Sequence, residues 1–148
     1  MSHFIYADHA ATTAVSDTAL QAMLPHFTTA YGNPSSLYRF AQEGKTDLER
    51  ARAEIAACLN ARPEEIYFTS GGTEADNWAL RGVAELMALK GRKGGHIITS
   101  AIEHDAVHAP CRRLEAEGVR VTYLRPNRQG FIEASSLAEA LTDDTVLV

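Results

Sequence analysis

The sequence lacks the features that mark several classes of protein. It has only two cysteines, Cys58 and Cys111, and they do not have the paired spacing of a zinc site. Two isolated thiols in an acidic chain favour a reducing, cytoplasmic setting. No apolar run approaches the roughly 20 residues that a membrane-spanning helix needs, and no N-terminal stretch has the pattern of a signal peptide. We therefore expect no association with a membrane.

An excess of positive charge is also absent. Lys and Arg number 14 against 19 Asp and Glu, which gives a net charge of -5. Proteins that bind nucleic acid through its phosphates need a basic patch or stripe, so we expect no nucleic-acid partner. The one dense basic run, at residues 90–93, falls between a predicted helix and a predicted strand and is interpreted as a solvated loop.

What the chain has instead is an alternation of short β-like runs with longer helical stretches. The pattern predicts four strands, at residues 65–69, 96–100, 119–124 and 145–148. Ser16 can cap a first helix, and further helices are predicted at residues 37–59, 73–89, 104–117 and 135–141. Such alternation is typical of an α/β fold with a mixed, mostly parallel sheet and helices on both of its faces.

The last predicted strand bears on the extent of the chain. The sequence ends inside the apolar run Thr145-Val146-Leu147-Val148. A free carboxylate is costly in a buried strand. We therefore expect the sequence to be the front part, or another fragment, of a longer protein.

The first candidate site is the segment Ser70-Gly71-Gly72-Thr73, which follows a predicted strand and opens a predicted helix. Helix N-termini offer unpaired N–H groups and a partial positive charge to anions. Two glycines let a ligand approach the backbone closely, and the hydroxyls of Ser70 and Thr73 can donate further hydrogen bonds. The alternative is a tight turn in which Ser or Thr merely caps the helix. The four residues alone leave the two interpretations about even.

The second candidate is Glu103-His104, which follows the strand at residues 96–100 and so lies at the same edge of the sheet. A histidine there can stack on a planar ring and carry protons near neutral pH. On its own it is more often a surface or capping residue. His104 and His108 have helical spacing, but the HExxH pattern and a third ligand are missing, so we expect no metal site. Two polar segments, at residues 8–13 and 32–36, are ordinary loops by default.

Taken together and in this order, these segments are specific. The strings Tyr6-Ala7-Asp8-His9-Ala10-Ala11-Thr12-Thr13, Tyr31-Gly32-Asn33-Pro34-Ser35-Ser36 and Phe68-Thr69-Ser70-Gly71-Gly72-Thr73-Glu74, followed by Glu103-His104, are the main matches. With them the chain resembles, over essentially its whole length, the N-terminal part of the cysteine desulfurases. These belong to the class V aminotransferase group of pyridoxal-phosphate enzymes.

The resemblance implies a role for each matching residue. Gly72 and Thr73 would bind the phosphate of pyridoxal 5'-phosphate, and His104 would stack over its ring and act as the catalytic histidine. Asn77 would support the turn. Ala11, Thr12 and Asn33 would lie on the substrate side of the cleft. In fold terms, residues 1–148 would be an N-terminal segment plus an incomplete large cofactor-binding domain. This would be the truncated front part of a type I pyridoxal-phosphate transferase fold, without the rest of that domain and the small C-terminal domain.

The resemblance also implies a reaction. In this family the sulfur of L-cysteine passes to an enzyme cysteine as a persulfide, L-alanine is released, and the sulfur goes on to iron–sulfur cluster assembly or thiolation. Partners would be L-cysteine, sulfur-acceptor or scaffold proteins, and a second copy of the full-length protein in a homodimer. The family's cofactor-bearing Lys and nucleophilic Cys would lie beyond Val148. We interpret Cys58 and Cys111, which fall in predicted helices, as buried structural thiols.

Two other functions remain open on these residues. Selenocysteine lyases and other class V members share the same N-terminal strings, so the chemistry could differ while the cofactor stays the same. A truncated chain could also persist as a non-catalytic binding or assembly module. In either case we expect the 148-residue chain alone to be inactive on cysteine.

Overall fold

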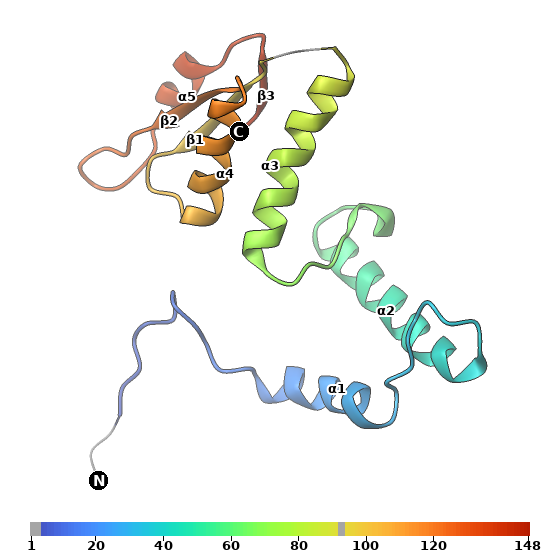
Figure 1. Cartoon of the computed structure of the whole chain (residues 1–148). Helices are drawn as coiled ribbons and strands as arrows, with labels where there is room; N and C mark the ends of the chain where they lie inside the picture. Colours follow the sequence, from blue (N-terminus) through green and yellow to red (C-terminus); the bar gives the residue numbers. More distant parts are fainter. Residues whose placement is uncertain (1–3, 92–93) are drawn as a thin grey trace. The chain divides into compact units, whose positions relative to one another are not determined.

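The computed structural model describes residues 4–91 and 94–148, so the end of the basic run at residues 90–93 lies outside the described residues. The chain forms two compact units, Met1–Tyr67 and Phe68–Val148. The first unit is helical, and the second contains a sheet with helices packed on it (Figure 1).

The first unit consists of α1 (Asp17–Thr28), α2 (Arg39–Cys58) and the short 3-10 helix η1 (Pro63–Glu65). Ser16 caps α1 as predicted, because its hydroxyl oxygen accepts a hydrogen bond from the backbone N–H of Ala19 at 3.2 Å. The loop between α1 and α2 crosses α2 closely. A Cβ on Gly44 would lie 2.9 Å from the carbonyl oxygen of Gly32. Only residues without side chains permit this approach.

The second unit alternates helices and strands along the chain. Its elements are α3 (Gly72–Leu89), β1 (His96–Ser100), α4 (Asp105–Ala116), β2 (Arg120–Leu124), α5 (Ala134–Ala140) and β3 (Thr145–Leu147). The strands form a parallel sheet in the order β2-β1-β3. Because crossovers between parallel strands are right-handed, this order places α4 and α5 on opposite faces. The α/β prediction is confirmed, and the described strands are all parallel.

The core of the second unit lies between the sheet and the pair α3 and α4, which pack along each other (Figure 1). Its buried members are Leu80 of α3, Ile97 of β1, and Cys111 and Leu114 of α4. Alternate residues of a strand face opposite sides of the sheet. Ile97 therefore faces α3 and α4. This packing holds the amino ends of both helices beside the sheet edge at which β1 ends.

His96 links the three strands at the opposite end of the sheet, where β1 begins. Its side chain is 2% exposed. Its Nδ1 lies 2.9 Å from the hydroxyl of Thr145 in β3, and its Nε2 lies 2.8 Å from the hydroxyl of Thr122 in β2. Burial, assisted by the nearby Arg120, lowers the pKa of His96 below its usual value, while Asp144 opposes that shift. The central strand is thus tied to both neighbours by one neutral ring.

The prediction of a strand at residues 65–69 is wrong. Pro63 begins η1 instead, and the Glu65 carboxylate accepts a hydrogen bond from the backbone N–H of Arg62 at 2.8 Å. Residues 66–69 form no regular structure, although the Arg52 guanidinium donates to the carbonyl of Ile66. An extended segment becomes a strand only when a neighbour pairs with it. Among the described residues, the sheet is formed by the three other predicted strands, with β1 between β2 and β3.

The prediction for the cysteines is half correct. Cys111 is fully buried in α4, and burial, followed by the charge of Glu115, raises the pKa of its thiol. Cys58 is exposed at the end of α2, where a position within a helix does not guarantee burial.

Candidate functional site

The amino end of α3 is an open backbone turn. The N-cap is Gly71, and no side chain caps the helix, so the alternative in which Ser70 or Thr73 is merely a cap is not what the structure has. A Cβ built on Gly71 or Gly72 would meet no atom within 4 Å. The first N–H groups of a helix have no partners within the helix. The turn therefore presents backbone donors beside free space.

Three side chains hold this turn in place. One carboxylate oxygen of Glu74 accepts hydrogen bonds from both the backbone N–H and the hydroxyl of Ser70, each at 2.7 Å. The Thr69 hydroxyl donates to the carbonyl of Gly71 at 3.1 Å. The Asn77 amide donates to the carbonyl of Thr73, one helical turn earlier, at 2.9 Å.

The hydroxyls of Ser70 and Thr73 were both expected to donate to a ligand, and the structure leaves only that of Thr73 free to do so. The Ser70 hydroxyl donates to Glu74 and is not free to donate to a ligand. The bonds from Ser70 hold the pKa of the Glu74 carboxyl below its usual value, the backbone bond contributing most. Among the described residues no hydrogen bond engages the Thr73 hydroxyl, so that hydroxyl stays available.

His104 is the N-cap of α4 and follows the carboxyl end of β1. Its Nδ1 accepts a hydrogen bond from the backbone N–H of Ala106 at 3.0 Å. A neutral ring that accepts at Nδ1 carries its hydrogen on Nε2. The capping bond therefore fixes the tautomer and leaves Nε2–H as the free donor. Ser100 and Glu103 brace the same loop through a hydroxyl-to-carboxylate bond of 2.8 Å.

Thr73 and His104, which lie 31 positions apart in the sequence, line one groove. The groove has a volume of about 390 Å³ and lies between α3 and α4. Asn77 of α3 lines it as well. Sequence reasoning missed the other residues that line the groove, which are Arg81 of α3 and Asp105, Ala106, Ala109, Pro110 and Arg113 of α4. Arg81 follows Asn77 by one helical turn, and this i, i+4 spacing is the signal that could have identified it.

The other predicted residues lie in the first unit. Ala11 and Thr12 belong to a turned segment that Tyr6 holds, since its hydroxyl donates to the carbonyl of Thr12 at 3.1 Å. Asn33 lies in the loop before α2, where its side-chain oxygen accepts from the backbone N–H of Ser35 at 2.9 Å. Among the described residues no hydrogen bond joins these two segments. The structure brings Thr73 and His104 together and leaves the position of Ala11, Thr12 and Asn33 relative to them open.

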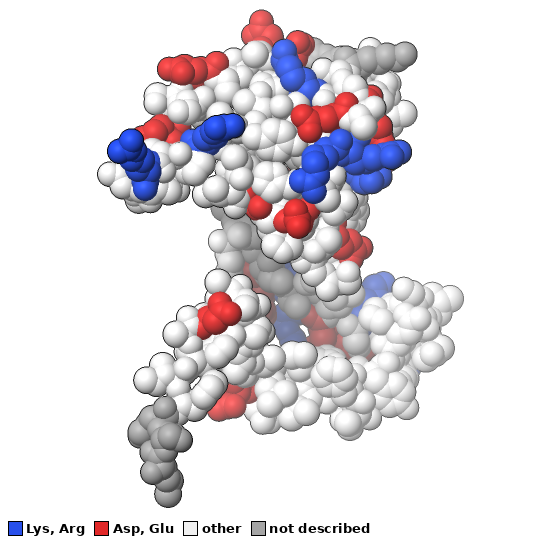
Figure 2. All heavy atoms as spheres, turned by 60° about the vertical axis from the view of Figure 1, so that its left-hand side comes forward, with Lys and Arg blue, Asp and Glu red and all other residues white. Residues whose placement is uncertain are grey.

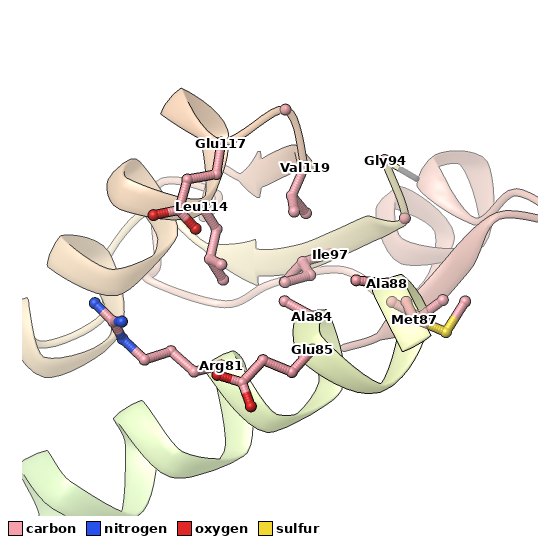
Figure 3. A pocket seen from close by; sticks show the side chains of 13 residues that line it. Arg81, Ala84, Glu85, Met87, Ala88, Gly94, Ile97, Leu114, Glu117 and Val119 are labelled. Atoms are coloured by element: carbon pink, nitrogen blue, oxygen red, sulfur yellow. The ribbon is translucent and has the colours of Figure 1, made fainter. Parts of the chain in front are cut away.

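A larger hollow of about 690 Å³ lies at the other end of α3 and α4 (Figure 3). Its lining is mainly apolar, with Ile97, Leu114 and Val119 in its wall, and Arg81 and Glu85 of α3 line it as well. None of the residues predicted from the sequence lines it. Size alone would select this hollow, whereas the chemistry of the side chains selects the smaller groove at the carboxyl end of β1, where ligands bind in open α/β sheets.

The surface charge, the length of the helices and the grouping of possible metal ligands further describe the molecule. On the face drawn in Figure 2, acidic and basic side chains are interspersed. Among residues 4–91 and 94–148, no helix has the length and apolar character needed to cross a membrane. Within the same residues no three His, Cys, Asp or Glu side chains are grouped as metal ligands. His108 stacks on Tyr123 instead, with ring centroids 5.6 Å apart.

The sequence of the chain matches a known protein family and known proteins. The family model described as aminotransferase class-V matches residues 5–148. The cysteine desulfurase IscS of Clostridium botulinum (strain Kyoto / Type A2) is 47% identical over 148 residues, which is 100% of this chain and 36% of that protein. The chain thus spans about a third of the length of this curated relative.

Two solved structures are similar in fold. A NifS-like protein superposes with a TM-score of 0.85 at 37% identity, over 93% of this chain and 37% of that one. The structure of SspA in complex with cysteine superposes with a TM-score of 0.84 at 38% identity, over 93% of this chain and 39% of that one. Both matches extend over nearly all of this chain.

Proposed function

Because the chain belongs to the class-V aminotransferase family, we propose that it forms the front part of a cysteine desulfurase and supplies one wall of a pyridoxal 5'-phosphate site. The proposal depends mainly on one observation, the groove that Thr73 and His104 both line. The similarity to cysteine desulfurases over the whole chain supports the choice of reaction. The named family and the groove thus point to the same chemistry.

The turn that opens α3 fits the phosphate of this cofactor, and its residue Thr73 also lines the groove. The turn offers the backbone N–H groups of Gly72 and Thr73 together with the free Thr73 hydroxyl, and it opens on space that no atom fills within 4 Å of a Cβ on Gly72. The amino end of an 18-residue helix adds a partial positive charge. The volume of about 390 Å³ is within the usual range for a small-molecule site.

His104 would act on the ring side of the site. Its Nδ1 accepts the Ala106 N–H bond, so the ring is oriented and its Nε2–H can hold a proton or donate it. When bound, pyridoxal 5'-phosphate supplies an electron sink for the breaking of bonds in an amino-acid substrate. Gly72 and Thr73 would thus bind and orient the cofactor through its phosphate, and His104 would stack on its ring and transfer protons. Ala11, Thr12 and Asn33 would contact the substrate.

We further propose the setting in which this site works. L-Cysteine is the substrate, and its sulfur passes as a persulfide to acceptor or scaffold proteins for iron–sulfur cluster assembly or thiolation. One solved relative is described as a complex with cysteine, which supports this choice. The full protein would be a cytoplasmic homodimer. Residues 1–148 would correspond to its N-terminal segment and part of its large cofactor-binding domain.

The phosphate site can be tested on the 148-residue chain. Pyridoxine 5'-phosphate is the suitable probe because it has no aldehyde and cannot react with surface lysines. Trp78, the only tryptophan, lies five residues after Thr73 on α3 and reports binding by its fluorescence. We expect saturable quenching, weakened about three- to tenfold by Thr73→Val, which removes one hydrogen-bonding hydroxyl. Thr46→Val, a hydroxyl removed from α2, is the matched control and should bind as the wild type does.

Two outcomes would contradict the proposal. Absence of quenching at millimolar probe would remove the phosphate site, and equal binding by Thr73→Val and the wild type would remove Thr73 from it. A separate assay with cysteine and pyridoxal 5'-phosphate should yield no alanine from this chain. Lys45 and Lys90 are both exposed, on α2 and at the end of α3, and neither lines the groove. Robust alanine production would show that the chain carries a complete active site.

A further inference from the structure

A carboxylate lies in the first turn of α3, where the proposed function requires an anion to bind. Glu74 is exposed, and its single Oε2 atom accepts both hydrogen bonds that Ser70 donates, each at 2.7 Å. The two residues bracket Gly71 and Gly72, which have no side chains with which to hold their own conformation. A negative charge at this place is favoured by the helix dipole but opposes an incoming phosphate, so its effect on phosphate binding depends on what else the carboxylate does.

We propose that Glu74 is a positioning residue, which ties Ser70 to the first turn of α3 and so holds the Gly72 and Thr73 N–H groups in place for a phosphate. This inference rests on the proposed function. The pattern of bonds around the turn supports it. Glu74 occupies the donors of Ser70, while Thr69 and Asn77 occupy the carbonyls of Gly71 and Thr73.

Hydrogen-bond donors remain that take no part in these bonds, and a phosphate needs such donors. The ties use the N–H and hydroxyl of Ser70 and two backbone carbonyls, and they leave the first N–H groups of α3 and the Thr73 hydroxyl for a ligand. A turn fixed before binding pays less conformational entropy when the ligand arrives. Loss of the tie should therefore weaken binding even though it removes a repulsive charge.

Charge and hydrogen bonding can be separated by two substitutions. Glu74→Gln and Glu74→Ala both remove the negative charge, but only glutamine keeps an oxygen that can accept the Ser70 N–H. Positioning predicts that Glu74→Ala binds pyridoxine 5'-phosphate about three- to tenfold more weakly than Glu74→Gln, the equivalent of about one net hydrogen bond. If charge alone matters, the two variants bind equally.

Glu85 provides the matched control. It is an exposed carboxylate on the same helix, 11 residues and therefore about three turns further on, and it does not line the groove of Thr73 and His104. Glu85→Gln and Glu85→Ala should bind the probe equally. A difference between them as large as the difference at position 74 would reduce the effect to general helix stability and overturn the inference.

A second measurement separates this inference from the proposed function. Hydrogen exchange of the Ser70 amide should be slowed in the wild type and in Glu74→Gln and should be accelerated at least severalfold in Glu74→Ala, whether or not a ligand is present. Equal exchange in all three proteins would refute the tie. If exchange follows this order but wild-type protein does not bind the probe, the proposed function fails while the tie stands. If wild-type protein binds and both Glu74 variants bind equally, positioning alone is refuted.

Discussion

Two glycines inside helices should respond with opposite sign to the same substitution. Gly44 lies in α2 and Gly82 in α3. A Cβ on Gly82 would be 3.9 Å from Cδ1 of Trp78, an ordinary van der Waals contact. A Cβ on Gly44 would be 2.9 Å from the carbonyl oxygen of Gly32, a backbone atom that cannot rotate aside. The intrinsic helix preference is the same at both sites, so the neighbours decide the outcome.

The magnitudes follow from that geometry. Alanine in place of glycine within a helix gains about 0.5–1 kcal/mol of stability. Gly82→Ala should keep this gain. Gly44→Ala should lose it, because forcing a methyl group into a packed contact costs about 1–3 kcal/mol. The net effect at position 44 is a destabilisation of roughly 0.5–2 kcal/mol, since the loop that contains Gly32 must move away from α2.

Urea unfolding distinguishes the two sites. Trp78 fluorescence reports on the second unit, which contains Gly82, and far-ultraviolet circular dichroism reports on the helices of both units. Gly82→Ala should move the fluorescence midpoint to higher urea, and Gly44→Ala should move the circular-dichroism midpoint to lower urea. If Gly44→Ala stabilises the protein as much as Gly82→Ala does, the close crossing of the loop over α2 is refuted.

Three further predictions concern titratable groups. His96 has a lowered pKa in the folded state. Its contribution to stability is therefore complete above the unfolded pKa of about 6.5 and is lost as the pH falls from there towards the folded pKa. His96→Gln should flatten the decline of the free energy of unfolding in that pH range, and an unchanged slope would contradict this. Cys58 should react rapidly with a thiol reagent in native protein, whereas Cys111, which is 0% exposed and has a raised pKa, should react only on unfolding. Burial and the hydrogen bond to Glu115 raise the pKa of Tyr123 to about 12, so ultraviolet titration should find one late tyrosine that Tyr123→Phe removes.

The sequence predicted the elements of the second unit well because each carries its own local signal. Ile97 and Ile98 mark a strand by burial on both faces, and the boundaries of α3 agree with the prediction to within one residue. The segment at residues 65–69 has the same apolar character, but strand formation there depends on a pairing partner that no local pattern encodes. Local pattern likewise could not show that Cys58 is exposed, because burial depends on what packs against a helix.

The sequence could name the residues of the candidate site, but it could not give their geometry. Gly72, Thr73 and His104 follow from short motifs, and the groove that Thr73 and His104 share depends on α3 packing along α4. The use made of each hydroxyl could not be foreseen. The hydroxyl of Ser70 donates to Glu74, whereas the hydroxyl of Thr73 is left free, and this difference depends on which side chains reach across the turn.

The two histidines that bracket β1 explain why the chemistry should lie at the carboxyl end of the sheet. His96 is closed at both ring nitrogens, by Thr122 and Thr145, and is 2% exposed, so it has no free atom to offer a ligand. His104 is held by one nitrogen only, through the N–H of Ala106, and keeps Nε2 free at an exposed position. A side chain that is oriented by one bond and open at its other donor can act on a ligand. A side chain that is satisfied at both can only hold the fold. The fixed sheet therefore carries the open histidine at the sheet edge where the groove lies.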